Sequence, residues 1–339
     1  MSDRRSIVVS ISGQQDDART GRAPPDVDVL MVNYNTADLV PKALAALAMA
    51  AGPLRYRVLL VDNASTDGSR DRLPACEDLD LAIFNDRNVG FGRANNQLLP
   101  HLQAEFVLLL NTDAFTEPHA LEIAVAHLHS HPTCGIVGGR LEGADGALQP
   151  CCRFFPTSWG VFVHRMGWQS WFPSARMMDD FNWPHDSVRS CDWVPGCFYL
   201  VRRSLIEQVG LFDERFFLYC EEMDHCRRSK QAGWEVHFVP EARVVHIGGA
   251  SAQTTETYDE RSRQVSVLQV ESELLYFRKH HGWPGVALHM VLVWLATALQ
   301  AAKDIGRRRP WTVLKHNLKE AALTTRVFLA TRMGSAPTR

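Results

Sequence analysis

The sequence lacks the features that mark several large classes of protein. No two of its eight cysteines are spaced as CxxC, and Cys151 and Cys152 are adjacent. This pattern favours scattered, reduced thiols in a cytosolic protein over a disulfide framework or a zinc site. The chain also lacks an excess of charge, because its formal net charge is −2. We therefore expect no general attraction to nucleic acid or to an anionic membrane.

Long apolar runs are absent before Ala287. The run from Ser6 to Val9 is too short for the core of a signal peptide, and a polar stretch follows it to Pro25. We expect residues 1–25 to form a flexible N-terminal extension. The remaining sequence has the composition of a soluble globular protein, with 46% hydrophobic and 22% charged residues.

From Asp26 onward, apolar runs alternate with segments rich in helix-forming residues. Strands are predicted at 27–32, 57–61, 81–84 and 106–110, and helices at 37–50, 93–103 and 118–130. Repeated strand–loop–helix units of this length predict an α/β fold with a doubly wound, mostly parallel sheet.

Polar side chains follow each of these strands. They are Asn33, Asn35, Asp62, Asn63, Asn88, Asn111 and Asp113. Loops at the carboxyl ends of parallel strands face one side of the sheet, so we expect a ligand site there. Turn and capping preferences explain any one of these residues, but not the whole set.

The segment Asn111-Thr112-Asp113 closes the apolar run 106–110. A carboxylate at the end of a buried strand points into the crevice where open α/β folds bind ligands. Oxygen ligands of this kind suit Mg²⁺ or Mn²⁺ bridging a diphosphate. A plain turn is the alternative interpretation of this segment.

Acidic residues return in the second half of the chain. Residues 150–190 are rich in Trp and Arg without a clear period, which is typical of a long functional loop. A strand at 192–201 and a helix at 203–209 follow. Next, Glu221, Glu222 and Asp224 open a helix that we expect to end at Gln231. Compensation of the helix dipole is one explanation. The other is that a cation, a sugar hydroxyl or a base function engages these carboxylates, with the helix N-terminus lowering the pKa of a carboxyl group.

Two further strands are predicted at 234–240 and 244–251. His246 lies at the end of the second of these, before Gly248 and Gly249. It is a candidate metal ligand or diphosphate contact, and a structural role is the alternative.

These segments together resemble the inverting family 2 glycosyltransferases of the GT-A fold, especially the rhamnosyltransferase-like branch. The matching motifs run in the family's order over roughly residues 26–250. They are Val32-Asn33-Tyr34-Asn35, Val61-Asp62-Asn63-Ala64-Ser65-Thr66-Asp67-Gly68-Ser69, Asn88-Val89-Gly90-Phe91-Gly92 with Asn95-Asn96, Leu110-Asn111-Thr112-Asp113, Val194-Pro195-Gly196, Phe212-Asp213-Glu214-Arg215-Phe216-Phe217, Glu221-Glu222-Met223-Asp224 and Val245-His246-Ile247-Gly248-Gly249. Each motif is weak alone, whereas the ordered set is specific.

The resemblance implies a role for each matching residue. Donor-binding roles fall on Asn33, Asn35, Asp62, Asn63, Asn88, Gly90 and Asn111, and acceptor-binding roles on Trp193, Gly196 and Glu221. Asp113 corresponds to the metal-binding acid of the DxD-type motif, in which Asn111 replaces the first Asp and removes one charge. Glu222 corresponds to the catalytic base, where the family more often has Asp. Asp224 binds the acceptor or orients the base, and His246 completes the site of a divalent cation, Mg²⁺ or Mn²⁺.

The function implied is transfer of a sugar from a nucleotide donor, best dTDP-L-rhamnose, to a hydroxyl of a lipid-linked or cell-surface glycan. Attack from the face opposite the leaving group gives inversion in one step. A galactofuranosyl- or other hexosyltransferase of the same family is the alternative within this class. A catalytically silent module that binds nucleotide sugars or glycans is the alternative outside it.

The carboxyl-terminal region is apolar and helical in character. A helix from Val286 to Ala302 would span about 25 Å, short of the roughly 30 Å of a bilayer core. Arg307-Arg308-Arg309 and an amphipathic helix to about Thr331 follow. We expect a hairpin resting on the cytoplasmic face of the inner membrane, close to a polyprenyl-diphosphate-linked acceptor. Packing onto the catalytic domain or a second subunit is the alternative.

The predicted organisation is thus a flexible extension over 1–25, a GT-A domain over 26–280 and a helical extension over 281–333. Within the GT-A domain, residues 26–140 form the nucleotide-sugar-binding half and residues 141–280 the acceptor and catalytic half.

Overall fold

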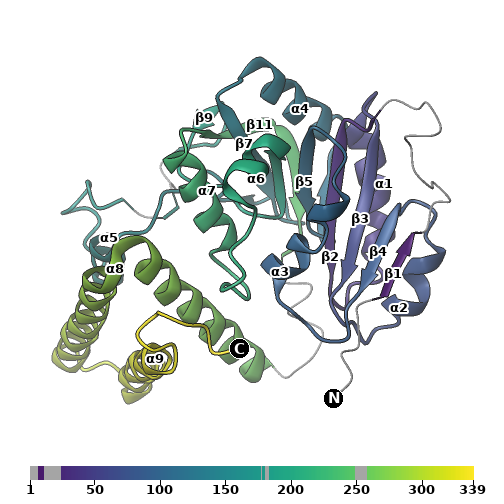
Figure 1. Cartoon of the computed structure of the whole chain (residues 1–339). Helices are drawn as coiled ribbons and strands as arrows, with labels where there is room; N and C mark the ends of the chain where they lie inside the picture. The colour runs from purple at the N-terminus through teal and green to yellow at the C-terminus, as the bar shows by residue number, and fades with distance from the viewer. Residues whose placement is uncertain (1–6, 11–23, 177, 180–182, 249–257) are drawn as a thin grey trace. The chain divides into compact units, whose positions relative to one another are not determined.

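A computed structural model describes residues 7–10, 24–176, 178–179, 183–248 and 258–339 (Figure 1). The chain divides into two compact units. The first, called the sheet unit, comprises Met1–Arg153, Phe181–Glu214 and Glu221–Glu256. The second, called the helical unit, comprises Phe154–Asp180, Arg215–Cys220 and Thr257–Arg339.

The sheet unit is built on one mixed sheet of 11 strands, with the order β1-β4-β3-β2-β5-β10-β7-β11-β6 and with β8 and β9 beside β7 and β11. The strands are β1 (Ile7–Ser10), β2 (Val27–Asn33), β3 (Tyr56–Asp62), β4 (Leu81–Phe84), β5 (Phe106–Leu110), β6 (Ala114–Thr116), β7 (Cys134–Glu142), β8 (Leu148–Gln149), β9 (Arg189–Ser190), β10 (Phe198–Arg202) and β11 (Glu235–His246).

The first half of the sheet is parallel. β4, β3, β2 and β5 run in one direction, which places their carboxyl ends at one edge. β10 is antiparallel to both β5 and β7, and β11 is parallel to β7. All residues of β5 are buried, because this strand lies inside the sheet between β2 and β10. The predicted α/β, doubly wound fold is confirmed.

Helices of the sheet unit connect these strands. They are α1 (Val40–Ala51), α2 (Ser69–Arg72), α3 (Phe91–Asn96), α4 (Ala120–Ser130), α6 (Arg203–Val209) and α7 (Glu221–Gln231). The helix predicted at 93–103 ends early, at Asn96, and a 3₁₀ turn follows at Leu99–His101. Pro100 has no N–H to continue an α-helix, which explains the change.

Two strand predictions differ from the structure. The segment predicted at 192–201 is a strand only from Phe198 onward, in β10, since Pro195 and Gly196 interrupt the extended run. The strands predicted at 234–240 and 244–251 form one strand, β11, with an irregularity between Val239 and Arg243. Residues 249–251 lie outside the described part of the chain.

The expected N-terminal extension falls mostly outside the described residues. Its described part includes β1, which pairs antiparallel with β4 at the edge of the sheet. β-branched residues at 7–9 favour this edge pairing.

The helical unit contains α5 (Ser158–Met166), α8 (Tyr258–Gly306) and α9 (Trp311–Ala330). α8 bends at Gly282, which has a φ of 65°, and Pro284 follows within the same helix (Figure 1). One core cluster joins α8 to α9 through Leu274, Phe277, Val286, Met290, Val327 and Phe328. Because α8 begins well before residue 281, this unit does not coincide with the extension predicted at 281–333.

One helical segment of the described chain, Val267–Gly306, has the length and composition needed to cross a membrane. An 18-residue window within it has a mean hydropathy of 1.7, and 33% of that window is buried.

Candidate functional site

The ends of β2 and β3 carry a buried polar pair. Asn33 and Asp62 are opposite each other in the parallel register, and they are 0% and 1% exposed. The amide Nδ2 of Asn33 donates to Oδ2 of Asp62 at 2.7 Å and to Oγ of Ser69 at 2.9 Å. Oδ1 of Asp62 accepts from the backbone N–H of Ser65. These bonds fix the loop after β3 against the end of β2.

The loop after β2 is held in the same way. Asn35 has a φ of 55°, a left-handed conformation that Asn tolerates better than most residues. Its Oδ1 accepts from the N–H of Thr66 at 2.6 Å, and its own N–H donates to Ser65 at 2.9 Å. Asn33, Asn35 and Asp62, which were predicted to bind the nucleotide-sugar donor, therefore belong to one hydrogen-bonded network.

Asn63 extends this network to the loop after β4. Its Nδ2 donates to Oδ1 of Asn88 at 2.9 Å, and its Oδ1 accepts from the N–H of Val89. Oδ1 of Asn88 also accepts from the N–H of Gly90. Gly90 has a φ of 90° and a ψ of 165°, a backbone conformation that needs glycine at the start of α3.

The segment Asn111-Thr112-Asp113 lies between β5 and β6. The N–H of Asn111 donates to the carbonyl of Cys197, which leads into β10. The hydroxyl of Thr112 lies 2.8 Å from that of Thr36. This contact joins the segment after β5 to the polar network after β2.

Asp113 lies beside His246. Oδ1 of Asp113 is 3.5 Å from Nε2 of His246. The other ring nitrogen, Nδ1, is 2.9 Å from Oε1 of Gln149 in β8, and the amide of Gln149 donates to the carbonyl of His246. With Nδ1 as the donor to Gln149, Nε2 keeps its lone pair toward Asp113. Carboxylate and imidazole atoms arranged in this way, with a second contact holding the ring, fit a divalent cation.

Glu222 lies in the first turn of α7, near Gly196. Its Oε2 is buried and has no hydrogen-bond partner among the residues that the structure describes. Burial raises the pKa of Glu222, and the N–H of Glu222, the charge of Arg153 and the N–H of Gly196 only partly oppose the shift. The expectation that the helix N-terminus lowers this pKa is therefore wrong, because loss of water outweighs the local dipoles.

The thiol of Cys197 is affected by the charges of both Asp113 and Glu222. Burial raises the pKa of its thiol, and the nearby carboxylates of Asp113 and Glu222 raise it further. Backbone contacts agree with this, because Asn111 is bonded to the carbonyl of Cys197 and a Cβ on the adjacent Gly196 would lie 3.9 Å from Cβ of Glu222. Asp113 is thus beside His246, and the bonds from Thr112 through Thr36 and Asn33 connect its segment to Asp62.

The other residues predicted in the second half are buried. Asp224 is 0% exposed, and its Oδ2 accepts from Nε of Arg228 at 2.8 Å. Arg228 also donates to the carbonyls of Val209, Gly210 and Leu211, so this pair anchors α7. Glu221 is 3% exposed.

Trp193 is 5% exposed and packs under Arg153, whose guanidinium carbon lies 4.8 Å from the ring centroid. Arg153 and Gln149 were not predicted as site residues. Gln149 ends the two-residue strand β8, and Arg153 lies at the start of the Trp- and Arg-rich loop, where no sequence period indicates which side chains turn inward.

Comparison with known proteins agrees with this arrangement. Residues 28–151 match Glycosyl transferase family 2. An N-acetylglucosaminyl-diphospho-decaprenol L-rhamnosyltransferase of Mycobacterium tuberculosis (strain ATCC 25618 / H37Rv) is 29% identical over 283 residues, which cover 78% of this chain and 88% of that protein. Rhamnosyltransferase WbbL of Escherichia coli (strain K12) is 41% identical over 66 residues, which cover 19% of this chain and 25% of the relative.

Among solved structures, a mannosyltransferase from Pyrobaculum calidifontis in complex with GDP-Man and Mn²⁺ has a similar fold. The TM-score is 0.50 at 17% identity, and the match covers 89% of each chain. At this identity the likeness concerns the fold.

Proposed function

We propose that this chain, which belongs to the family 2 glycosyltransferases of the rhamnosyltransferase-like type, transfers L-rhamnose from dTDP-L-rhamnose to a hydroxyl of a lipid-linked glycan. The reaction is a single displacement with inversion at the anomeric carbon. The observation that carries this proposal is that the charges of Asp113 and Glu222 both act on Cys197, next to the polar network after β2 and β3.

The nucleotide half of the donor is assigned to the network of Asn33, Asn35, Asp62, Asn63, Asn88 and Gly90. Each carboxylate oxygen of Asp62 is engaged by one protein donor and retains capacity for another. A ribose hydroxyl or a base N–H is a suitable partner. Asn111, whose N–H is fixed by Cys197, is assigned to the diphosphate side.

Asp113 and His246 are assigned to a divalent cation, Mg²⁺ or Mn²⁺. When bound, such a cation would neutralise the charge that develops on the leaving diphosphate. Gln149 keeps the His246 ring oriented for this purpose. Because Asn111 replaces one carboxylate of the motif, the protein supplies one negative charge fewer to the cation. The donor diphosphate therefore supplies a larger share of the negative charge around it.

Glu222 is assigned as the general base. It takes the proton of the acceptor hydroxyl while the oxygen bonds to the anomeric carbon and the bond from that carbon to the diphosphate breaks. The raised pKa of Glu222 brings its proton affinity closer to that of the reacting hydroxyl. Asp224 has a positioning role, since its pair with Arg228 anchors the helix that carries Glu222.

The acceptor side is assigned to Glu221, Gly196 and Trp193, together with the guanidinium of Arg153 above the Trp193 ring. Trp193 is buried, so it acts by holding Arg153, which lies near Glu222. A cation at this position suits an acceptor that carries a diphosphate.

The helical unit is assigned to peripheral contact with an anionic membrane at the cytoplasmic face. Leu288, Val291 and Leu295 of α8 are 54%, 53% and 45% exposed, and they recur at helical spacing. Arg307-Arg308-Arg309 follows the same helix. An apolar face followed by basic residues is the usual composition of an interfacial helix.

Co-sedimentation with vesicles tests this contact. We expect binding to vesicles that contain anionic lipid, and weaker binding for the Leu288→Asp/Val291→Asp double variant. Met49→Asp is the matched control, because Met49 is 63% exposed in the sheet unit. Equal binding of the double variant and the control would reject the contact.

A screen of nucleotide sugars with the purified chain tests the activity. We expect release of dTDP from dTDP-L-rhamnose in the presence of a polyprenyl-diphosphate-linked acceptor, dependent on Mg²⁺ or Mn²⁺ and lost in Asp113→Asn. Glu214→Gln is the control, since this exposed carboxylate pairs with Arg93. Turnover of a UDP-sugar alone would reject rhamnose as the donor sugar, and donor binding without turnover of any sugar would identify a silent binding module.

A further inference from the structure

A second cluster of chemically reactive side chains lies at the end of the sheet where β7 and β11 begin, opposite the strand ends that carry the candidate active site. His237 is near the start of β11, whereas His246 ends the same strand. Nine residues of extended chain span up to about 30 Å, so this cluster is separate from the candidate active site. Its other members are His127 in the last turn of α4 and Cys134 at the start of β7.

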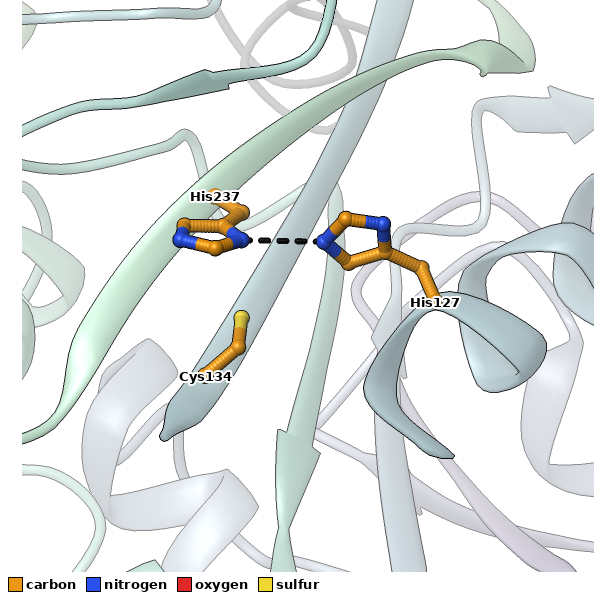
Figure 2. Close-up of side chains that lie close together, drawn as sticks. All are labelled: His127, Cys134 and His237. Carbon is orange, nitrogen blue, oxygen red and sulfur yellow. Dashed lines mark hydrogen bonds between the residues drawn. The ribbon is translucent and has the colours of Figure 1, made fainter. Parts of the chain in front are cut away.

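The side chains converge on a common point (Figure 2). Nε2 of His127 and Nδ1 of His237 are 2.9 Å apart. One donor atom from each of His127, Cys134 and His237 lies within 4.8 Å of the other two. Cys134 is fully buried and His237 is 8% exposed, which limits competition from water.

The separations of a tetrahedral metal site fall between the 2.9 Å of the two ring nitrogens and the 4.8 Å that bounds the whole cluster. Zn–N bonds of about 2.0 Å and a Zn–S bond of about 2.3 Å place ligand atoms roughly 3.3–3.6 Å apart. The two imidazole nitrogens have to separate by roughly 0.5 Å to reach this value. A small rotation of the His127 ring, which is only half-buried, provides this movement.

A second contact orients His237. Its Nε2 lies 3.1 Å from Oε2 of Glu235, and the same carboxylate accepts from the hydroxyl of Thr133 at 3.0 Å. With Nε2 as the donor to Glu235, Nδ1 keeps its lone pair toward His127 and Cys134. A carboxylate behind a histidine is the usual support for a metal-binding imidazole.

The protonation states also suit a metal site. Burial, with the neighbouring His131 and His237, lowers the pKa of His127 to about 4, and burial lowers the pKa of His237 as well. Both rings are therefore neutral near pH 7. Burial raises the pKa of Cys134 to about 12, so binding has to release the thiol proton.

We propose that His127, Cys134 and His237 bind one Zn²⁺ ion, with water at the fourth position. Thiolate and imidazole ligands favour Zn²⁺ over the Mg²⁺ or Mn²⁺ assigned to Asp113 and His246. His131 stacks on the ring of His127 with a centroid distance of 4.0 Å, and its Nδ1 is engaged by the carbonyl of His127. The ion joins α4, β7 and β11 and stabilises the sheet unit away from the active site.

Metal titration of the full chain after removal of metals with a chelator tests this site. Zn²⁺, measured by competition with a chromophoric chelator, is expected to bind with one ion per chain and to raise the melting temperature. Co²⁺ is expected to give a tetrahedral spectrum with a sulfur-to-metal charge-transfer band. One thiol proton leaves per ion, so the apparent affinity is expected to rise about tenfold per pH unit below the pKa of Cys134.

Four variants separate this site from the alternatives. Cys134→Ser is expected to remove the charge-transfer band, and His237→Gln to remove the rise in melting temperature. Glu235→Gln is expected to weaken Zn²⁺ binding by about 10–100-fold. His129→Gln is the control on α4, because this ring packs against Phe106 instead of facing the cluster.

Asp113→Asn distinguishes the two metal sites. It is expected to abolish sugar transfer and to leave the charge-transfer band unchanged, whereas Cys134→Ser is expected to retain sugar transfer. A wild-type chain that binds Co²⁺ without the band, or that fails to bind Zn²⁺, would overturn the proposal and leave an ordinary hydrogen-bonded pair of histidines. The wild-type spectrum decides this even if a variant does not fold.

Discussion

The hydroxyl of Thr36 lies 2.8 Å from the hydroxyl of Thr112, and both groups are buried. Thr36 donates its proton to Oδ1 of Asn33 at 2.7 Å, so Thr112 is the donor in the contact between the two hydroxyls. This chain of bonds links the segment that carries Asp113 to the network that contains Asn33 and Asp62. It sets the position of the proposed cation site relative to the proposed nucleotide site.

Thr112→Val removes this link without changing the size of the side chain. We expect the free energy of unfolding to fall by about 1 kcal/mol, because Thr36 loses one hydrogen bond. We also expect a higher KM for the donor, since the two parts of its site are no longer joined. Denaturant unfolding and donor kinetics measure both effects, and Thr112→Ser should restore them. A valine variant with unchanged KM would contradict this coupling.

The positions of these residues at the strand ends were predictable from the sequence because strand ends and loop chemistry are local properties. Apolar runs fixed the strands, and the polar residues that follow them had to meet at one edge once the strands were parallel. Asn33, Asp62 and Asp113 are examples. Their mutual hydrogen bonds were not predictable, because these depend on the register of β2 against β3 and on the conformation of the loops.

Glu222→Gln tests the proposed base. We expect kcat to fall by about 10²–10⁴-fold, the usual contribution of a general base. In the wild type, activity requires ionised Glu222, so it should decline as pH falls through a pKa above the ordinary value for glutamate. A pH profile of kcat measures this decline on the acidic side. Glu214→Gln is the exposed control, and full activity of Glu222→Gln would exclude Glu222 as the base.

The same substitution has a predicted effect on stability. Because the pKa of Glu222 is raised in the folded chain, ionisation of this group opposes folding as pH rises through that pKa. We therefore expect Glu222→Gln to melt at a higher temperature than the wild type near pH 8. The difference should shrink toward pH 4, where the wild-type carboxyl is protonated. A lower melting temperature at pH 8 would contradict burial as the cause of the shift.

Other features of the chain were not visible in its sequence. Arg153 comes from a loop without a period and Gln149 from the short strand β8, and tertiary contacts alone bring them to Glu222 and His246. Cysteine spacing argued against zinc, yet Cys134 meets His127 from a helix and His237 from a distant strand. Clusters assembled from separate elements leave no short motif, so spacing rules miss them.

Gly196→Ala separates the fit of the acceptor from the stability of the fold. An added Cβ would lie 3.7 Å from the Phe91 ring and 3.9 Å from Cβ of Glu222, which are ordinary contact distances. We expect a change in stability within about 0.5 kcal/mol and a lower kcat/KM for the acceptor. Gly138→Ala is the contrast, because its Cβ would meet Cβ of Val194 at 2.5 Å. We expect that variant to lose about 1–3 kcal/mol.

Unchanged acceptor kinetics in Gly196→Ala would remove Gly196 from the acceptor side of the site. Thermal or denaturant unfolding of the two alanine variants, measured together, shows whether the expected difference in packing exists.

Two neighbouring ion pairs, one between β2 and β3 and one between the residues just before these strands, provide a matched test of stability. Asp28 is 0% exposed and accepts from Arg57 at 2.6 Å and from the N–H groups of Gln103 and Ala104. Asp28→Asn is expected to cost about 3 kcal/mol, because Arg57 is left without its buried partner. Asp26→Asn is expected to cost less than about 0.5 kcal/mol, since the Asp26 side chain is 39% exposed and 3.4 Å from Arg55. Denaturant unfolding compares the two variants, and equal losses would show that burial does not control the strength of these pairs.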